Sequence, residues 1–149
     1  MLAFLRTPGY ASASTDASGT FSIGLSLLEH TVDDGNTILP FVFAETTSGT
    51  VSGRQVGSGT LILHPDGSVN ARHSGTFTGR IAGHAGTAIL LIKAWGTLNA
   101  LKARFVFSQG TRGLEDIDAR GTLVGGVIAT TKTGDPIIAG SYTGKVRLN

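Results

Sequence analysis

The sequence contains no cysteine, which excludes disulfides, thiolate metal sites and cysteine nucleophiles. Charged residues are also scarce, at 15% of the chain, and the formal net charge is only +2. The basic residues are scattered singly from Arg6 to Arg147 and form no stripe or cluster along the sequence. Because a phosphate backbone is bound by gathered Lys and Arg side chains, we expect no nucleic-acid partner.

Long hydrophobic runs are missing as well. No run approaches the ~20 apolar residues of a membrane helix, and we expect ILLI at 89–92 to be the centre of a buried strand. Near the N-terminus, only Leu2 to Leu5 form an apolar run, which is shorter than the about 7–15 residues of a secretory signal. We therefore expect residues 1–16 to form a loosely ordered arm, residues 17–149 to form one domain, and the protein to be cytoplasmic without membrane insertion.

Signature motifs of several enzyme classes are absent. The chain has no Gly-x-Ser-x-Gly nucleophile elbow, no phosphate-binding loop and no dinucleotide-binding fingerprint. The glycine-containing segment GTLVGGV at 121–127 is followed by no predicted helix, so it does not qualify. We therefore expect no cofactor.

The four histidines do not form a metal-ligand pattern. They are His30, His64, His73 and His84, and no two have the spacing that would bring them together on a helix or a strand. His64 and His73 flank the Pro-Asp-Gly turn, but His64 is predicted to pair near Val69 instead. We expect surface or edge histidines and no metal site.

Glycine is abundant, at 22 of 149 residues, about twice the average share of roughly 7%. A glycine allows a strand to bend or bulge, and a threonine restores strand propensity directly after it. The dipeptide Gly-Thr recurs with a spacing of about one strand and one turn, which is typical of sandwiches and barrels. It occurs at 19–20, 49–50, 59–60, 75–76, 86–87, 96–97, 110–111 and 121–122.

Alternating apolar residues predict eight strands and no helix. A short acidic segment, LEDID at 114–118, is expected to be a loop or one short turn. Two of the strands, around 37–43 and 87–92, carry apolar residues on both faces, which suggests a barrel with an apolar lumen and a covered outer wall. The predicted strands cover 18–30, about 37–47, 56–64, 68–77, 85–95, 101–108, about 119–130 and 139–148.

Four segments carry a family resemblance: ASGTFSIGLSLLE (17–29), FAETTSGTVSGRQVGSGTLIL (43–63), PDGSVNARHSGTFTGRIAGHAGT (65–87) and GTRGLEDIDARGTL (110–123). Together they resemble a bacterial domain-of-unknown-function family related to allene oxide cyclase-like barrels. The resemblance covers roughly residues 17–149 and consists mainly of corners and turns. The family often has an aromatic and acidic run after the apolar opening of its first strand, whereas LSLLEHT retains only Glu29 here.

The resemblance implies an all-β fold: a single antiparallel eight-stranded barrel of the allene oxide cyclase-like, calycin-like type, with little or no helix. It also implies a homo-oligomer. Relatives of this barrel include cofactor-independent cyclases and other binders of hydrophobic small molecules, although a fold alone does not determine function.

Two carboxylates are candidate catalytic groups. Glu45 continues the alternating set Leu39, Phe41 and Phe43, so it either points into the lumen with a raised pKa or lies solvated at the rim. Glu29, at the end of the first predicted strand, has the same two interpretations.

Lys93 and Tyr142 complete the catalytic candidates. Lys93 shares a strand face with Leu91 and Trp95, so it is either a lumen cation or a side chain whose stem extends to the rim. Tyr142 either donates a hydrogen bond to a ligand or packs. Trp95 is expected in the lumen or at its mouth, and the predicted ligand-binding residues are Phe41, Phe43, Leu91, Trp95 and Phe105.

Three functions remain open at this point. The first is a cofactor-independent cyclase or isomerase that acts on a hydrophobic small molecule held in the lumen, where confinement and one proton-transferring group suffice. The second is a non-catalytic carrier of an apolar molecule. The third is a structural barrel with a packed interior. Polar groups deep in the lumen favour the first, and an all-apolar cavity favours the second.

Overall fold

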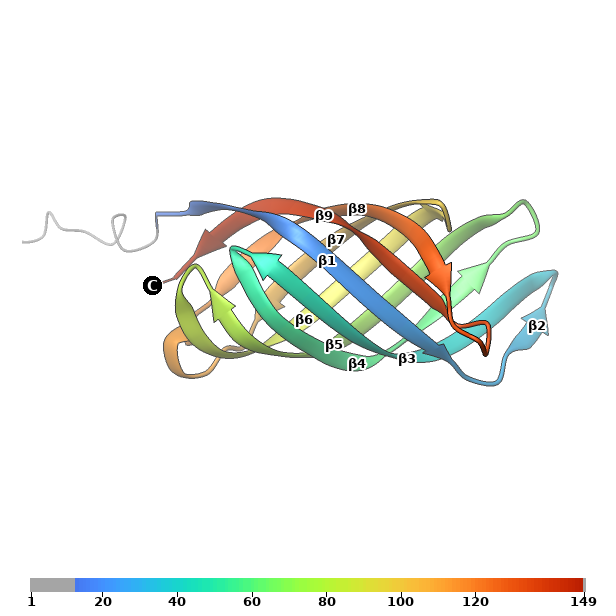
Figure 1. The fold of residues 1–149 in the computed structure, drawn as a ribbon, viewed down its shortest axis with the longest axis horizontal. Helices are drawn as coiled ribbons and strands as arrows, with labels where there is room; N and C mark the ends of the chain where they lie inside the picture. The colour runs from blue at the N-terminus through green and yellow to red at the C-terminus, as the bar shows by residue number, and fades with distance from the viewer. Residues whose placement is uncertain (1–12, 149) are drawn as a thin grey trace, which may run out of the picture.

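Nine antiparallel strands form one sheet that closes into a barrel (Figure 1). The computed structural model describes residues 13–148. Neighbouring strands pair in the order β1-β9-β8-β7-β6-β5-β4-β3-β2, and an additional pairing of β1 with β3 closes the barrel. The strands are β1 (Thr15–Leu27), β2 (Thr31–Asp33), β3 (Asn36–Gly49), β4 (Val51–Leu63), β5 (Ser68–Ile81), β6 (His84–Thr97), β7 (Ala100–Ser108), β8 (Asp118–Thr130) and β9 (Pro136–Arg147).

The predicted antiparallel eight-stranded barrel is confirmed, and β2 is an additional short strand that pairs only with β3. Its hairpin turn is Asp34–Gly35, with φ of 53° and 81°, the positive values that Asp-Gly provides in tight hairpins. The only helical segment among residues 13–148 is a 3₁₀ turn, η2 (Arg112–Leu114), close to the short turn predicted at 114–118. No helix in this part of the chain is long and apolar enough to cross a membrane.

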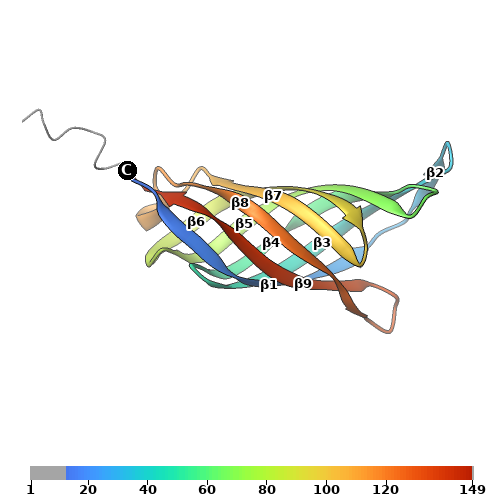
Figure 2. The same ribbon diagram turned by 90° about the horizontal axis from the view of Figure 1, so that it is seen from above.

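The two ends of the barrel differ. At one end the β7–β8 connection folds against β6, with Leu114 and Ile117 buried and the Thr111 amide donating to the Thr87 carbonyl. At the other end the β2–β3 hairpin and the β8–β9 connection project beyond the barrel wall (Figure 2). This second end, called the open end below, is ringed by partly buried apolar side chains: Leu27, Leu39, Leu63, Leu98, Leu101 and Val127.

Residues 1–12 of the predicted arm lie outside the described residues, whereas Thr15 and Asp16 already belong to β1. The outer faces of the doubly apolar strands are exposed in the single chain, with Val42 at 43% and Leu91 at 50% exposure. A homo-oligomer that would cover them remains a prediction.

Tyr142 connects β9 to the β3–β4 turn. Its hydroxyl donates to the Ser48 carbonyl (2.7 Å) and accepts from the Val51 amide (2.9 Å). Gly19 makes this approach possible, since a Cβ there would lie 1.9 Å from the Ser48 carbonyl oxygen and 2.5 Å from the tyrosine hydroxyl. Gly49, which has a φ of +98°, supplies the turn. The Gly-Thr pairs at 19–20 and 49–50 therefore both contribute to one junction, in which Tyr142 of β9 binds the β3–β4 turn.

We predict that Tyr142→Phe destabilises the barrel by about 1–3 kcal/mol, because the buried Val51 amide loses its partner. Urea unfolding followed by circular dichroism measures this difference. Tyr10→Phe is the matched control, since it removes the only other tyrosine hydroxyl. Equal unfolding free energies for Tyr142→Phe and the wild type would contradict the importance of this junction.

Candidate functional site: the barrel lumen

The lumen contains a buried carboxyl group, that of Glu45. The inward positions of β3 alternate from Phe41 through Phe43 and Glu45 to Thr47, because successive side chains of a strand point to opposite faces. Glu45 is only 2% exposed, and its Oε1 atom has no hydrogen-bond partner. Of the two interpretations of Glu45 at the sequence level, the structure shows the lumen position.

An imidazole lies in the same lumen. His73 is the inward residue of β5 between Ala71 and Gly75, it is 9% exposed, and neither ring nitrogen has a partner. Its ring makes edge contacts with Phe43 and Phe41, with ring centroids 4.7 and 5.7 Å apart. The expectation of a surface or edge histidine is therefore wrong for His73, whose side chain follows the inward phase of β5.

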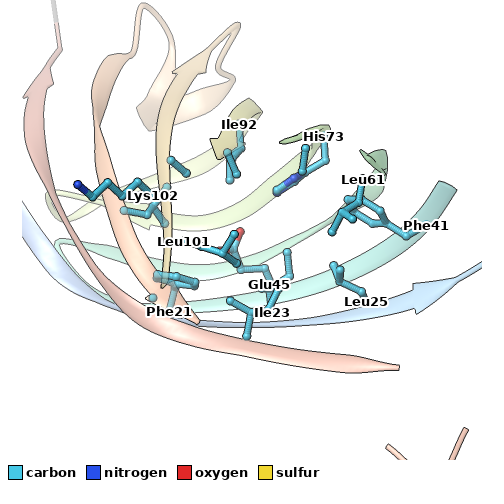
Figure 3. Close-up of a pocket in the computed structure, with 16 residues that line it drawn as sticks. Phe21, Ile23, Leu25, Phe41, Glu45, Leu61, His73, Ile92, Leu101 and Lys102 are labelled. Carbon is cyan, nitrogen blue, oxygen red and sulfur yellow. The ribbon is translucent and has the colours of Figure 1, made fainter. Parts of the chain in front are cut away.

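Glu45 and His73 border one cavity of about 60 Å³ in the half of the barrel near the open end (Figure 3). Its wall is otherwise apolar, apart from the β7 segment at Lys102, whose ammonium group points away from the cavity. The volume exceeds the roughly 10–15 Å³ that one water molecule needs. The cavity is lined by Phe21, Ile23, Leu25, Phe41, Glu45, Leu61, Ala71, His73, Ile92, Ala94, Leu101, Lys102, Ala103, Leu123, Gly125 and Ile138.

A second cavity, of about 20 Å³, lies deeper in the barrel and shares Glu45, Ile92 and Leu123 with the first. It also contains Gln55, whose Oε1 has no partner and whose side chain is 1% exposed. Glu45 thus lines both cavities.

Burial shifts the two titratable groups in opposite directions. Desolvation raises the pKa of Glu45 from 4.5 to about 8 and lowers the pKa of His73 from 6.5 to about 4, because an apolar environment disfavours each charged form. The usual order of a carboxyl and an imidazole is inverted. At neutral pH the lumen therefore offers a protonated acid and an unprotonated base, both neutral.

Four other predicted site residues are inside the barrel. Phe41, Phe43, Phe105 and Tyr142 are all buried; Phe41 lines the larger cavity, whereas Phe105 and Tyr142 line the smaller one. Burial raises the pKa of the Tyr142 hydroxyl, and its hydrogen bonds to backbone groups favour the packing interpretation over the catalytic one.

Four predicted residues lie outside the lumen. Leu91, Lys93 and Trp95 face outward on β6, because the inward positions of this strand are Ala88, Leu90 and Ile92. The predicted placement of Trp95 in the lumen or at its mouth, and of Leu91 as a lumen residue, is therefore wrong. Glu29 is exposed in the β1–β2 connection and borders neither cavity.

Sequence reasoning missed His73 and Gln55. Both stand on strand phases in which glycine and alanine replace large apolar residues, so the alternation is hard to recognise around them. The large apolar residues on the same strand face identify each of the two as inward. For His73 these residues are Val69 and Phe77, and for Gln55 they are Val51 and Leu61. Within residues 13–148, no three His, Asp or Glu side chains are grouped as a metal site would require.

No protein-family model matches the chain, and no curated protein matches it significantly. The structure is similar to the crystal structure of a protein from Shewanella oneidensis that belongs to the DUF3224 family and has an unknown function. The TM-score is 0.64 at 17% identity, over 87% of this chain and 96% of the other. At this identity the likeness shows a shared fold, so it agrees with a bacterial barrel of unknown function and not specifically with an allene oxide cyclase relation.

The inverted pKa values predict an unusual pH dependence of stability. Between pH 4.5 and about 8 only the native state keeps the Glu45 proton, so the unfolding free energy falls as pH rises. Between about pH 4 and 6.5 only the unfolded state protonates His73, so this residue makes the unfolding free energy rise with pH. The two slopes cancel between pH 4.5 and 6.5, and stability then falls by roughly 2 kcal/mol up to pH 8.

Urea unfolding of Glu45→Gln and His73→Gln across pH 4–9 tests this assignment. Glu45→Gln is expected to remove the fall above pH 6.5, whereas His73→Gln is expected to extend the fall down to pH 4.5. Identical pH profiles for the wild type and Glu45→Gln would refute a protonated carboxyl in the lumen.

Proposed function

We propose that the protein is a cofactor-independent isomerase or cyclase that acts on a small, mainly apolar molecule in the barrel lumen. The observation that carries the proposal is Glu45: a buried carboxyl, protonated at neutral pH, with an unpartnered oxygen beside a cavity. A carboxylic acid held neutral by an apolar site can donate a hydrogen bond or a proton to a ligand oxygen.

His73 supplies the complementary base. In a substrate with a carbonyl group and a carbon–carbon double bond between its β and γ carbons, the Glu45 carboxyl would protonate the carbonyl oxygen while the unprotonated imidazole of His73 takes a proton from the α carbon. The electrons of that C–H bond form a second carbon–carbon double bond, and the product is a dienol. Transfer of the imidazolium proton to the γ carbon, and of the enol proton to the Glu45 carboxylate, restores the carbonyl group, leaves the double bond between the α and β carbons and regenerates both groups. The cycle needs no cofactor.

The apolar wall provides the remaining contribution. It excludes water and holds a flexible molecule in a restricted set of conformations, which lowers the entropic part of the barrier. A cavity of about 60 Å³ is smaller than the ~150 Å³ cavity that holds benzene, so it has room for a molecule of a few heavy atoms or for one end of a longer molecule that enters through the open end. The resemblance to allene oxide cyclase-like barrels noted in the sequence agrees with this reaction class. The DUF3224 protein is described as having an unknown function and therefore adds no support.

A non-catalytic carrier is the second candidate. The observation that favours it is the low pKa of His73, about 4, which makes the imidazole a weak base. In a carrier, Glu45 and His73 would orient the polar end of an apolar ligand by hydrogen bonds, and no bond would change.

Exchange of the α-hydrogens of acetone in D₂O, followed by proton NMR, tests the acid–base step without knowledge of the natural substrate. The wild type is expected to accelerate exchange over buffer, and Glu45→Gln is expected to lose about 100-fold of that acceleration, since positioned acid–base groups contribute about 10²–10⁴-fold. Glu115→Gln, which removes an exposed carboxylate, is the control and should retain full acceleration.

Binding is measured in parallel by acetone-induced changes in the protein NMR spectrum, with Ala94→Phe as a variant that fills the cavity. Binding without exchange assigns the lumen to a carrier. If neither binding nor exchange occurs, mass spectrometry of an organic extract of the purified protein decides. A stoichiometric co-purified molecule that the Ala94→Phe variant does not carry supports the lumen as a ligand site. If the wild type carries no such molecule, the proposal is overturned.

A further inference from the structure

The outer wall of the barrel carries a row of three cations. Arg72 on β5 is the register partner of Lys93 on β6, and Lys93 is the register partner of Arg104 on β7. All three side chains are exposed and point outward. Adjacent strands lie about 4.8 Å apart, so the row spans about 10 Å. Basic residues that are scattered along the sequence are therefore brought together in space, because strand pairing places residues that are far apart in the sequence side by side.

None of the three cations is neutralised within the barrel. Across residues 13–148 the ion pairs are Arg120–Asp118 and Lys145–Asp16, and neither involves this row. Like charges directly opposite each other in a sheet destabilise it. A row of this kind is an unfavourable arrangement for the free protein and a favourable one for binding an extended anion.

Trp95 lies beside the row. It stands two residues after Lys93 on the same face of β6, about 7 Å further along the strand, and it is 38% exposed. The Arg104 guanidinium carbon is 5.8 Å from the centroid of its ring. These side chains border an open groove of about 550 Å³ on the outer wall, which is also lined by Thr60, Ile62 and Asn70.

We propose that this groove binds a nucleotide: a phosphate ester attached to a flat aromatic ring. Neighbouring phosphorus atoms of a di- or triphosphate lie closer together than neighbouring strands, so the long, exposed side chains of the three cations would converge on the phosphates. The indole offers a surface on which a base stacks, as aromatic side chains do in proteins that bind single strands. The groove contains no carboxylate that would repel the phosphates. The site lies outside the lumen and is independent of the function proposed there.

Trp95 is the only tryptophan of the chain, so its fluorescence reports on the groove directly. Titration with ATP is expected to quench this fluorescence, whereas tripolyphosphate is expected to bind more weakly and adenosine not to bind measurably. Lys93→Gln and Arg104→Gln are each expected to weaken ATP binding by about two- to fivefold, which is the effect of losing one exposed ion pair. Arg54→Gln, an exposed cation on the same wall outside the groove, is the matched control.

Calorimetry with Trp95→Ala separates the two halves of the site. This variant is expected to bind ATP at least about fivefold more weakly but to bind tripolyphosphate as the wild type does. A single-stranded deoxyadenosine hexamer distinguishes the source of the nucleotide: tighter binding of the strand indicates nucleic acid, and equal or weaker binding indicates a free nucleotide.

Three results would overturn the proposal. One is the absence of binding by both ATP and the hexamer at millimolar concentration. Another is an equal loss for Arg54→Gln and Arg104→Gln, which would indicate general charge attraction. The third is preferential binding of an aspartate- and glutamate-rich peptide over both nucleotide probes, which would assign the groove to an acidic protein partner.

Discussion

The pairing of β1 with β3 is the constraint on which the rest of the structure depends. It converts a nine-stranded sheet with two edges into a closed wall, with only the short β2 left outside it. Once the wall is closed, the two-residue period of each strand divides the chain into an inner and an outer set. Glu45 and His73 lie inside for that reason, and for the same reason Lys93 and Trp95 lie outside beside cations from other strands.

Small residues determine what the closed wall can contain. Where large aromatic side chains point inward, as at Phe77 and Phe107, the barrel is filled, and the rings pack edge to face with centroids 5.3 Å apart. Where alanine or glycine points inward, as at Ala71, Ala94 and Gly125, space remains and forms the larger cavity. The high glycine content therefore has two effects: it permits the sharp corners of the strands, and it leaves room beside two polar groups.

Much of the fold was predictable from the sequence, because turns and alternation are local signals. The position of Glu45 was accessible in the same way, since Phe41 and Phe43 precede it on one phase. The inward face of the segment ILLIKAW (89–95) could not be predicted in this way. Leu90 and Ile92 compete with Leu91 and Trp95 as the inward set, and only the pairing of β6 with both neighbours decides between them. His73 was missed because Ala71 and Gly75 weaken its phase, and the cation row was missed because it exists only across strands.

The β7–β8 connection, where Leu114 and Ile117 are buried, bears on how the proposed ligand would move. If that connection covers its end of the barrel, the lumen is a dead-end channel, and a ligand would leave past the same apolar side chains by which it entered. Two ligand molecules could not pass each other in such a space, so one would have to leave before the next could enter. Exchange would then be limited by vacancy of the lumen, and a retained product would exclude the next substrate molecule.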